Sequence, residues 1–164
     1  MIQFTIGSDT SPEAIERIIK DYLTKAKHAS KKPSLSINIA GNGITSLDKY
    51  DITQDQVDAE VLDAIKQLQN YITISSIRSG GQTGVDEAGI KAGLALGIPT
   101  HVHAPRGFRF RVLDRNSKSG YKDISNRDQF LSRFTGPTPT MKGKPVITKA
   151  NKLEMEIANL ENYA

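Results

Sequence analysis

The chain lacks cysteine and tryptophan, and only 6% of its 164 residues are aromatic. Without cysteine, disulfides, thiolate zinc sites and cysteine nucleophiles are excluded, and a cytoplasmic location is expected. No apolar run approaches the ~20 residues of a membrane-spanning helix, so we expect no membrane partner. Residues 1–4 do not begin a basic segment with a long apolar stretch behind it, so a secretory signal is not expected either.

A mild basic excess is present: the net charge is +4 and the sequence pI is about 9.3. This charge permits phosphates, nucleotides or nucleic acid as partners but requires none of them. The length suits one ordinary domain, which we place over residues 1–135. Residues 136–164 are predicted to form a proline-containing arm and a C-terminal helix at 149–161.

Segments in which apolar and polar residues alternate, as in strands, take turns along the chain with segments in which apolar residues recur at helical spacing. Strands are predicted at 2–6, 35–39, 72–78, 99–103 and 108–112. Helices are predicted at 12–29, after the capping box that starts at Thr53, at 84–96, and from a cap near Asn126 to Arg133. This order predicts an α/β fold, a Rossmann-like parallel sheet with helices on both faces. Ligands of such sheets lie beyond the carboxyl ends of the strands.

The most informative stretch is residues 79–87, Ser-Gly-Gly-Gln-Thr-Gly-Val-Asp-Glu, between a predicted strand and a predicted helix. Glycines let a ligand approach the backbone closely, and a helix start offers N–H groups and a positive dipole to an anion. Gln82 and Thr83 would add side-chain hydrogen bonds. The ligand-binding residues predicted in this loop are Ser79, Gly80, Gly81, Gln82, Thr83 and Gly84.

Two further loops should reach the same edge, because right-handed crossovers bring the carboxyl ends together. One is residues 41–43, and the other is residues 104–107, where the Arg106 guanidinium suits a phosphate. The ligand-binding residues predicted outside the central loop are Gly41, Asn42, Gly43, Arg78, Arg106 and Arg109.

Several polar residues keep alternative interpretations. Asp86 either complements the helix dipole or binds ribose hydroxyls and acts as acid or base, which makes it the candidate catalytic residue. Glu87 is expected to be structural. Arg109 and Arg111 alternate with phenylalanines, which predicts one basic and one apolar strand face. His101 and His103 share a strand face without an evident third ligand, so we expect neither a metal nor a cofactor.

Residues 79–86, followed by Gly-Ile-Pro at 97–99 and Ala-Pro-Arg-Gly at 104–107, resemble the molybdenum-cofactor-carrier-like branch of the SLOG superfamily. This Rossmann-like group includes lonely-guy phosphoribohydrolases, DNA-processing A proteins and nucleotide-sensing domains of antiviral systems. The resemblance covers roughly residues 35–112. It implies a Rossmann-like fold and a ligand made from nucleotides. It also implies a homo-oligomer, because sites in this superfamily are often completed at a dimer interface.

The predicted function is to bind a phosphate-bearing, nucleotide-derived small molecule, either ADP-ribose-like or a cyclic signalling nucleotide. Binding would sense the molecule or sequester it, the latter being what a viral counter-defence protein needs. We expect binding rather than catalysis, because no complete catalytic constellation is visible. The first alternative is a phosphoribohydrolase-like nucleotide N-glycosidase that uses Asp86 or Glu87. Single-stranded DNA binding ranks last, because aromatic residues for base stacking are scarce.

Overall fold

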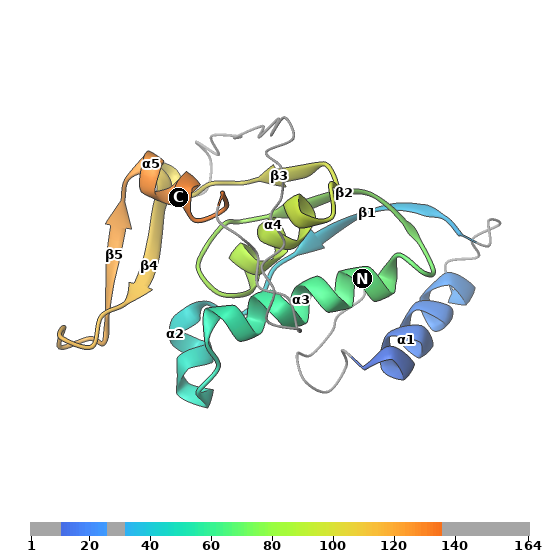
Figure 1. The fold of residues 1–164 in the computed structure, drawn as a ribbon, viewed down its shortest axis with the longest axis horizontal. Helices are drawn as coiled ribbons and strands as arrows, with labels where there is room; N and C mark the ends of the chain where they lie inside the picture. The colour runs from blue at the N-terminus through green and yellow to red at the C-terminus, as the bar shows by residue number, and fades with distance from the viewer. Residues whose placement is uncertain (1–10, 26–31, 136–164) are drawn as a thin grey trace.

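The computed structural model describes residues 11–25 and 32–135. The strand predicted at 2–6, the proline-containing arm and the helix predicted at 149–161 lie outside the described residues. In chain order the elements are α1 (Pro12–Lys25), β1 (Ser34–Ile39), α2 (Ile44–Leu47), the 3-10 helix η1 (Asp48–Tyr50), α3 (Gln54–Leu68), β2 (Thr73–Ser79), α4 (Val85–Ala95), β3 (Thr100–Val102), the 3-10 helix η2 (Arg106–Phe108), β4 (Arg109–Leu113), β5 (Tyr121–Ser125) and α5 (Arg127–Ser132) (Figure 1).

Three parallel strands form the central sheet in the order β1-β2-β3. Helix α3 connects β1 to β2 and helix α4 connects β2 to β3, which gives the Rossmann-like α/β fold that the sequence predicts. One face of β1 and β2 joins α1, α3 and α4 in a single buried apolar cluster. The opposite face carries the exposed polar side chains of Ser36, Asn38 and Arg78. The two crossover helices therefore share one face of the sheet, whereas the sequence predicts helices on both faces.

The helices begin where the sequence places their caps. The Ser11 hydroxyl accepts a hydrogen bond from the first turn of α1 at 3.2 Å. Thr53 and Gln56 form the predicted capping box of α3, with backbone-to-side-chain bonds of 3.3 and 2.8 Å. Asn126 accepts a bond from the Gln129 N–H at 2.9 Å and caps α5. These caps satisfy N–H groups that the helices cannot satisfy internally.

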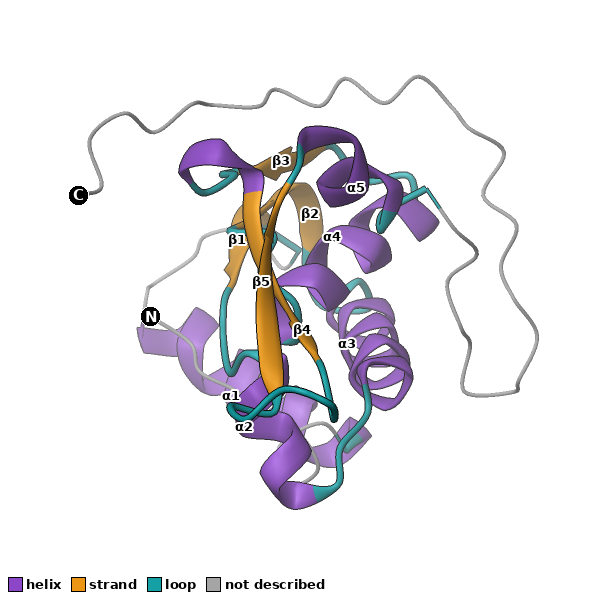
Figure 2. Cartoon of the chain, turned by 90° about the vertical axis from the view of Figure 1, so that its left-hand side faces the viewer, coloured by secondary structure: helices purple, strands orange, loops and turns teal. Residues whose placement is uncertain are grey.

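Strands β4 and β5 form a separate antiparallel ribbon, which stands at the carboxyl end of the central sheet (Figures 1 and 2). The predicted division of β4 into two faces is confirmed: Phe110 is 3% exposed, whereas the Arg109 side chain is 60% exposed. The apolar face packs on a second buried cluster with Phe130 and Phe134 of the α5 region. Strand β5 is a correction, since the sequence pattern predicts no strand after β4.

Within the described parts of the chain, none of the helices has the length and apolar character needed to cross a membrane.

Candidate functional site

The two glycine loops meet at the carboxyl edge of the sheet. Gly43 and Gly84 form an antiparallel bridge. The Ile44 N–H donates to the Thr83 carbonyl at 3.1 Å, and the Val85 N–H donates to the Asn42 carbonyl at 3.1 Å. The loop after β1 is thus bonded directly to the loop after β2, although about forty residues separate them in the sequence.

Several glycines of the second loop stand where a side chain would meet its neighbours, and two of them, Gly80 and Gly84, lie against the start of α4 or the first loop. Gly84 has a φ of +107°, and a Cβ there would collide with the Asn42 carbonyl oxygen. A Cβ on Gly80 would lie 2.6 Å from Asp86 Oδ2. The glycines therefore allow the backbone to close around the first turn of α4.

Asp86 turns back into this loop. Its Oδ1 accepts the Gly41 N–H at 3.2 Å, and its carboxylate also accepts backbone bonds from Gly80 and Gln82. Burial raises the pKa of Asp86, and the three backbone bonds oppose that rise. The amides that the sequence pattern assigns to a ligand hold the protein's own carboxylate in this structure.

The start of α4 is likewise occupied by protein groups. The Gly84 N–H donates to Gln54 Oε1 at 2.6 Å, and Gln54 Nε2 donates back to the Gly84 carbonyl at 2.9 Å. The Glu87 N–H donates to the Gln82 carbonyl at 2.9 Å. These partners fix the loop, and they leave ligand recognition to side chains around it.

Gln82 and Thr83 bind the β4–β5 ribbon. Gln82 Nε2 donates to the Arg109 carbonyl at 3.0 Å, and Gln82 Oε1 accepts the Arg111 N–H at 3.3 Å. The Thr83 hydroxyl donates to the Arg111 carbonyl. The Gln82 amide thus pairs with β4 as a neighbouring strand would, and the glycine loop fixes the position of the two arginines.

A polar cleft of about 320 Å³ lies between the glycine loops and the ribbon. We call it the hairpin cleft; it is lined by Gly41, Gly43, Ile44, Thr45, Gln82, Thr83, Asp86, Arg109, Arg111 and Asp123. Arg111 binds Asp123 through Nε at 2.8 Å and Nη2 at 3.2 Å, and the Arg109 Nε lies 3.6 Å from Asp123. The cleft therefore contains two guanidinium groups and two carboxylates at its surface.

A second set of charges is buried beside the first turn of α4. In this buried ion-pair cluster, Lys91 Nζ lies 2.6 Å from Asp58 Oδ2 and 2.7 Å from Glu87 Oε1. Arg133 binds Glu87 Oε2 and the Gly81 carbonyl, each at 2.6 Å. Burial raises the pKa of Asp58 and lowers that of Arg133. Glu87 has the structural surroundings expected for it.

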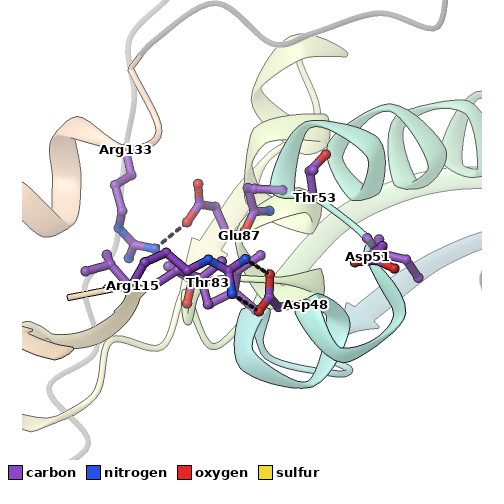
Figure 3. Close-up of a pocket in the computed structure, with 12 residues that line it drawn as sticks. Asp48, Asp51, Thr53, Thr83, Glu87, Arg115 and Arg133 are labelled. Carbon is purple, nitrogen blue, oxygen red and sulfur yellow. Dashed lines mark hydrogen bonds and ion pairs between the residues drawn. The ribbon is translucent and has the colours of Figure 1, made fainter. Parts of the chain in front are cut away.

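A second cavity of about 450 Å³ lies beside this cluster (Figure 3). Arg115 spans one side of it and binds Asp48 through two hydrogen bonds of 2.9 and 2.5 Å. Glu87 and Arg133 also line it. This cavity was not predicted from the sequence, because it depends on α2 and η1, which no sequence pattern indicated.

The structure brings part of the predicted site together. The hairpin cleft contains Gly41, Gly43, Gln82, Thr83, Asp86 and Arg109. The predicted residues that do not line it are Asn42, Arg78, Ser79, Gly80, Gly81, Gly84 and Arg106. Ser79 is buried, and its hydroxyl donates to the Ile39 carbonyl at 2.7 Å. Arg78 and Arg106 are exposed.

Four residues that line the cleft are not indicated by the sequence patterns: Ile44, Thr45, Arg111 and Asp123. The sequence predicts Arg111 only as part of a basic strand face. Asp123 was missed because β5 was missed. No sequence signal marks this pair, because Arg111 and Asp123 oppose each other only in the β4–β5 register.

Among the described residues, no group of three or more histidine and acidic side chains is placed to hold a metal ion. No family model, curated protein or solved structure matches the chain. The resemblance to the SLOG superfamily therefore stays a prediction.

Proposed function

We propose that the chain binds a small, phosphate-bearing molecule derived from a nucleotide, and that the hairpin cleft is its site. The observation that carries this proposal is that Arg109 and Arg111 line the same cleft as the Asp86 carboxylate. Guanidinium groups suit phosphate oxygens, and a carboxylate suits the hydroxyls of a ribose. The volume lies at the lower end of the range for small-molecule sites.

The two arginines differ in availability. The Arg111 side chain is 35% exposed, is stacked 3.9 Å from the Tyr121 ring centroid and binds Asp123 through two nitrogens. The Arg109 side chain is 60% exposed and makes one long contact with Asp123. Arg109 therefore supplies the guanidinium that an arriving phosphate meets first, and Arg111 supplies a fixed second contact.

The ligand class remains the one expected from the sequence, an ADP-ribose-like compound or a cyclic signalling nucleotide that is sensed or sequestered. We propose that this happens in the cytoplasm and in a homo-oligomer. Light scattering measures the subunit number directly. A monomeric mass at micromolar concentration would contradict the oligomer and leave the ligand proposal standing.

Calorimetric titration of the full chain with AMP, ADP-ribose and adenosine tests the binding proposal. AMP and ADP-ribose should bind with micromolar to millimolar dissociation constants, whereas adenosine, which lacks phosphate, should bind at least about 10-fold more weakly. Equal binding of AMP and adenosine, or no binding of either phosphate compound, would contradict the proposal.

A second candidate function is cleavage of a nucleotide N-glycosidic bond. It is favoured by Asp86, a half-buried carboxylate of raised pKa that lines the cleft. Incubation with nucleotides, followed by chromatography for free base, measures this activity. Turnover that Asp86→Asn abolishes would establish the enzyme, and absence of free base in every reaction would leave binding as the function.

A further inference from the structure

The guanidinium of Arg111 is bound at one edge and unbound at the other. Its Nε and Nη2 donate to Asp123 at 2.8 and 3.2 Å. A guanidinium has further N–H donors on Nη1 and Nη2. Among the described residues, none accepts a hydrogen bond from Nη1 or a second one from Nη2. The end of the guanidinium therefore keeps a pair of donors, which is an arrangement that binds two oxygens of one phosphate.

A phosphate can bind this end without displacing Asp123. The carboxylate occupies the side edge, formed by Nε and Nη2, whereas the end edge is formed by Nη1 and Nη2. Arg111 and Asp123 both line the hairpin cleft, and 35% of the Arg111 side chain is exposed. Because the two residues are directly opposed in the β4–β5 register, the ribbon keeps them together. The ion pair can thus stay intact when a ligand arrives.

Tyr121 holds the plane of this guanidinium. The Arg111 Cζ lies 3.9 Å from the centroid of the Tyr121 ring, in the stacked arrangement of a cation–π contact. Tyr121 precedes Asp123 by two residues on β5, so its side chain shares the ribbon face of Arg111. Arg109 has no such ring contact among the described residues, and its side chain is 60% exposed. An arginine that is already ordered loses less conformational entropy when it binds a ligand.

We propose that the end edge of Arg111 is the phosphate subsite of the hairpin cleft, and that Tyr121 is the positioning residue that holds this edge in place. The inference rests on the proposed function, because it concerns how the same cleft binds the same ligand. Tyr121 acts through Arg111 and does not touch the ligand. Its hydroxyl has no hydrogen-bond partner among the described residues, so the ring alone performs the role.

Calorimetric titration of AMP into Tyr121→Leu and Tyr121→Phe tests the proposal. Tyr121→Leu removes the ring and should weaken AMP binding about 5-fold, because the ligand must then order Arg111 itself. Tyr121→Phe keeps the ring and should bind AMP within about 2-fold of the wild type. Ribose 5-phosphate, which lacks the base, should lose the same factor in Tyr121→Leu. An unchanged affinity for ribose 5-phosphate would show that the ring stacks on the base and would contradict the proposal.

A double-mutant cycle separates positioning from a general loosening of the ribbon. Arg111→Met removes the phosphate contact and should itself weaken AMP binding about 10-fold. In the Arg111→Met protein, adding Tyr121→Leu should change the AMP affinity by less than about 2-fold, because no guanidinium remains to be held. A loosened ribbon would instead weaken binding by the same factor in both backgrounds, since Arg109 lies on the same strand as Arg111.

The inference and the proposed function can fail separately. If the wild type binds AMP but Tyr121→Leu binds it equally well, the inference is overturned and the proposed function stands. A loss in Tyr121→Phe as large as that in Tyr121→Leu has the same consequence, as does an undiminished effect of Tyr121→Leu in the Arg111→Met protein. If the wild type binds neither AMP nor ADP-ribose, the proposed function and the inference both fall.

Discussion

Asp86 and Glu87 are neighbours on the first turn of α4, yet they belong to two different electrostatic environments. Glu87 is 5% exposed and binds two cations, Lys91 and Arg133. Asp86 is half-buried, and its hydrogen-bond partners are backbone amides of the glycine loops. Each environment contains two carboxylates and two cations. The buried ion-pair cluster combines Glu87 and Asp58 with Lys91 and Arg133. The hairpin cleft combines Asp86 and Asp123 with Arg109 and Arg111.

The difference lies in what a ligand can reach. In the buried ion-pair cluster every carboxylate has a cation at 2.7 Å or less, and the side chains are nearly sealed from water. In the hairpin cleft the charges are exposed enough to exchange partners. Removing one member of a buried pair leaves an uncompensated charge, whereas exposed pairs contribute little to stability. We therefore expect the first cluster to govern folding and the second to govern binding.

The largest expected effect is that of Arg133→Met, which leaves the Glu87 carboxylate without one of its two cations. The free energy of unfolding should fall by about 3–5 kcal/mol in urea titrations. The matched change in the other cluster, Arg109→Met, should cost less than about 1 kcal/mol. Equal losses for the two variants would remove the distinction between the clusters.

Gly84→Ala comes next, because its φ of +107° and the nearby Asn42 carbonyl both oppose a side chain. We expect a loss of roughly 2–4 kcal/mol in unfolding free energy. Gly97→Ala is the control, since Gly97 also has a positive φ (+66°) but an added Cβ there would have nothing within 4 Å. That variant should lose about 1 kcal/mol. If Gly97→Ala lowered the unfolding free energy as much as Gly84→Ala, backbone strain alone would account for the loss.

Asp86→Asn should cost about 1–3 kcal/mol, because an amide offers one acceptor oxygen where the loops present three N–H donors. Thermal unfolding monitored by circular dichroism measures the loss. An unchanged midpoint would mean that the three backbone bonds do not hold the loops together.

The raised pKa of Asp86 predicts the direction in which the stability of the protein changes with pH. Its folded pKa lies above the unfolded value, so the folded state binds more protons in the window between the two. The stability of the wild type relative to Asp86→Asn should therefore rise as pH falls from neutral through that window. A difference that is constant with pH, or that shrinks in acid, would contradict the raised pKa.

Gln82→Ala should lower the free energy of unfolding by about 1 kcal/mol, because it removes two side-chain contacts to β4. Its clearer signature is local. The Arg111 amide, which donates to Gln82, should exchange with deuterium faster, while amides in the middle of α3 should not change. Uniform acceleration across both elements would indicate global destabilisation instead.

The sequence predicts the parallel sheet and the sheet edge at which the glycine loops lie. Alternating isoleucines define β1 and β2, side-chain caps define α1 and α3, and carboxyl ends of parallel strands share one edge. Strand β5 escaped because residues 121–125 hold only two apolar side chains, Tyr121 and Ile124, among polar ones. Helix α2 was not predicted because it has only four residues and its N-cap residue, Gly43, has no side chain to cap it.

The sequence does not show which groups accept hydrogen bonds from the backbone amides of the glycine loops. Local pattern places Asp86 in the first turn of α4, but its bond to Gly41, in the loop after β1, arises only when β1 and β2 pair. The same holds for Gln82, whose partner β4 begins 27 residues later. A glycine-rich loop indicates close approach of the backbone, and tertiary packing decides whether a ligand or the protein itself makes that approach.

We propose that the cleft arginines, rather than the loop amides, hold the ligand's phosphate. Titration of AMP into the wild type, Arg109→Gln and Arg127→Gln tests it most directly, because the Arg127 side chain is 61% exposed and lies outside the cleft lining. We predict a loss of about 10-fold or more in affinity for Arg109→Gln and less than about 2-fold for Arg127→Gln. Equal affinities for all three proteins would contradict the account.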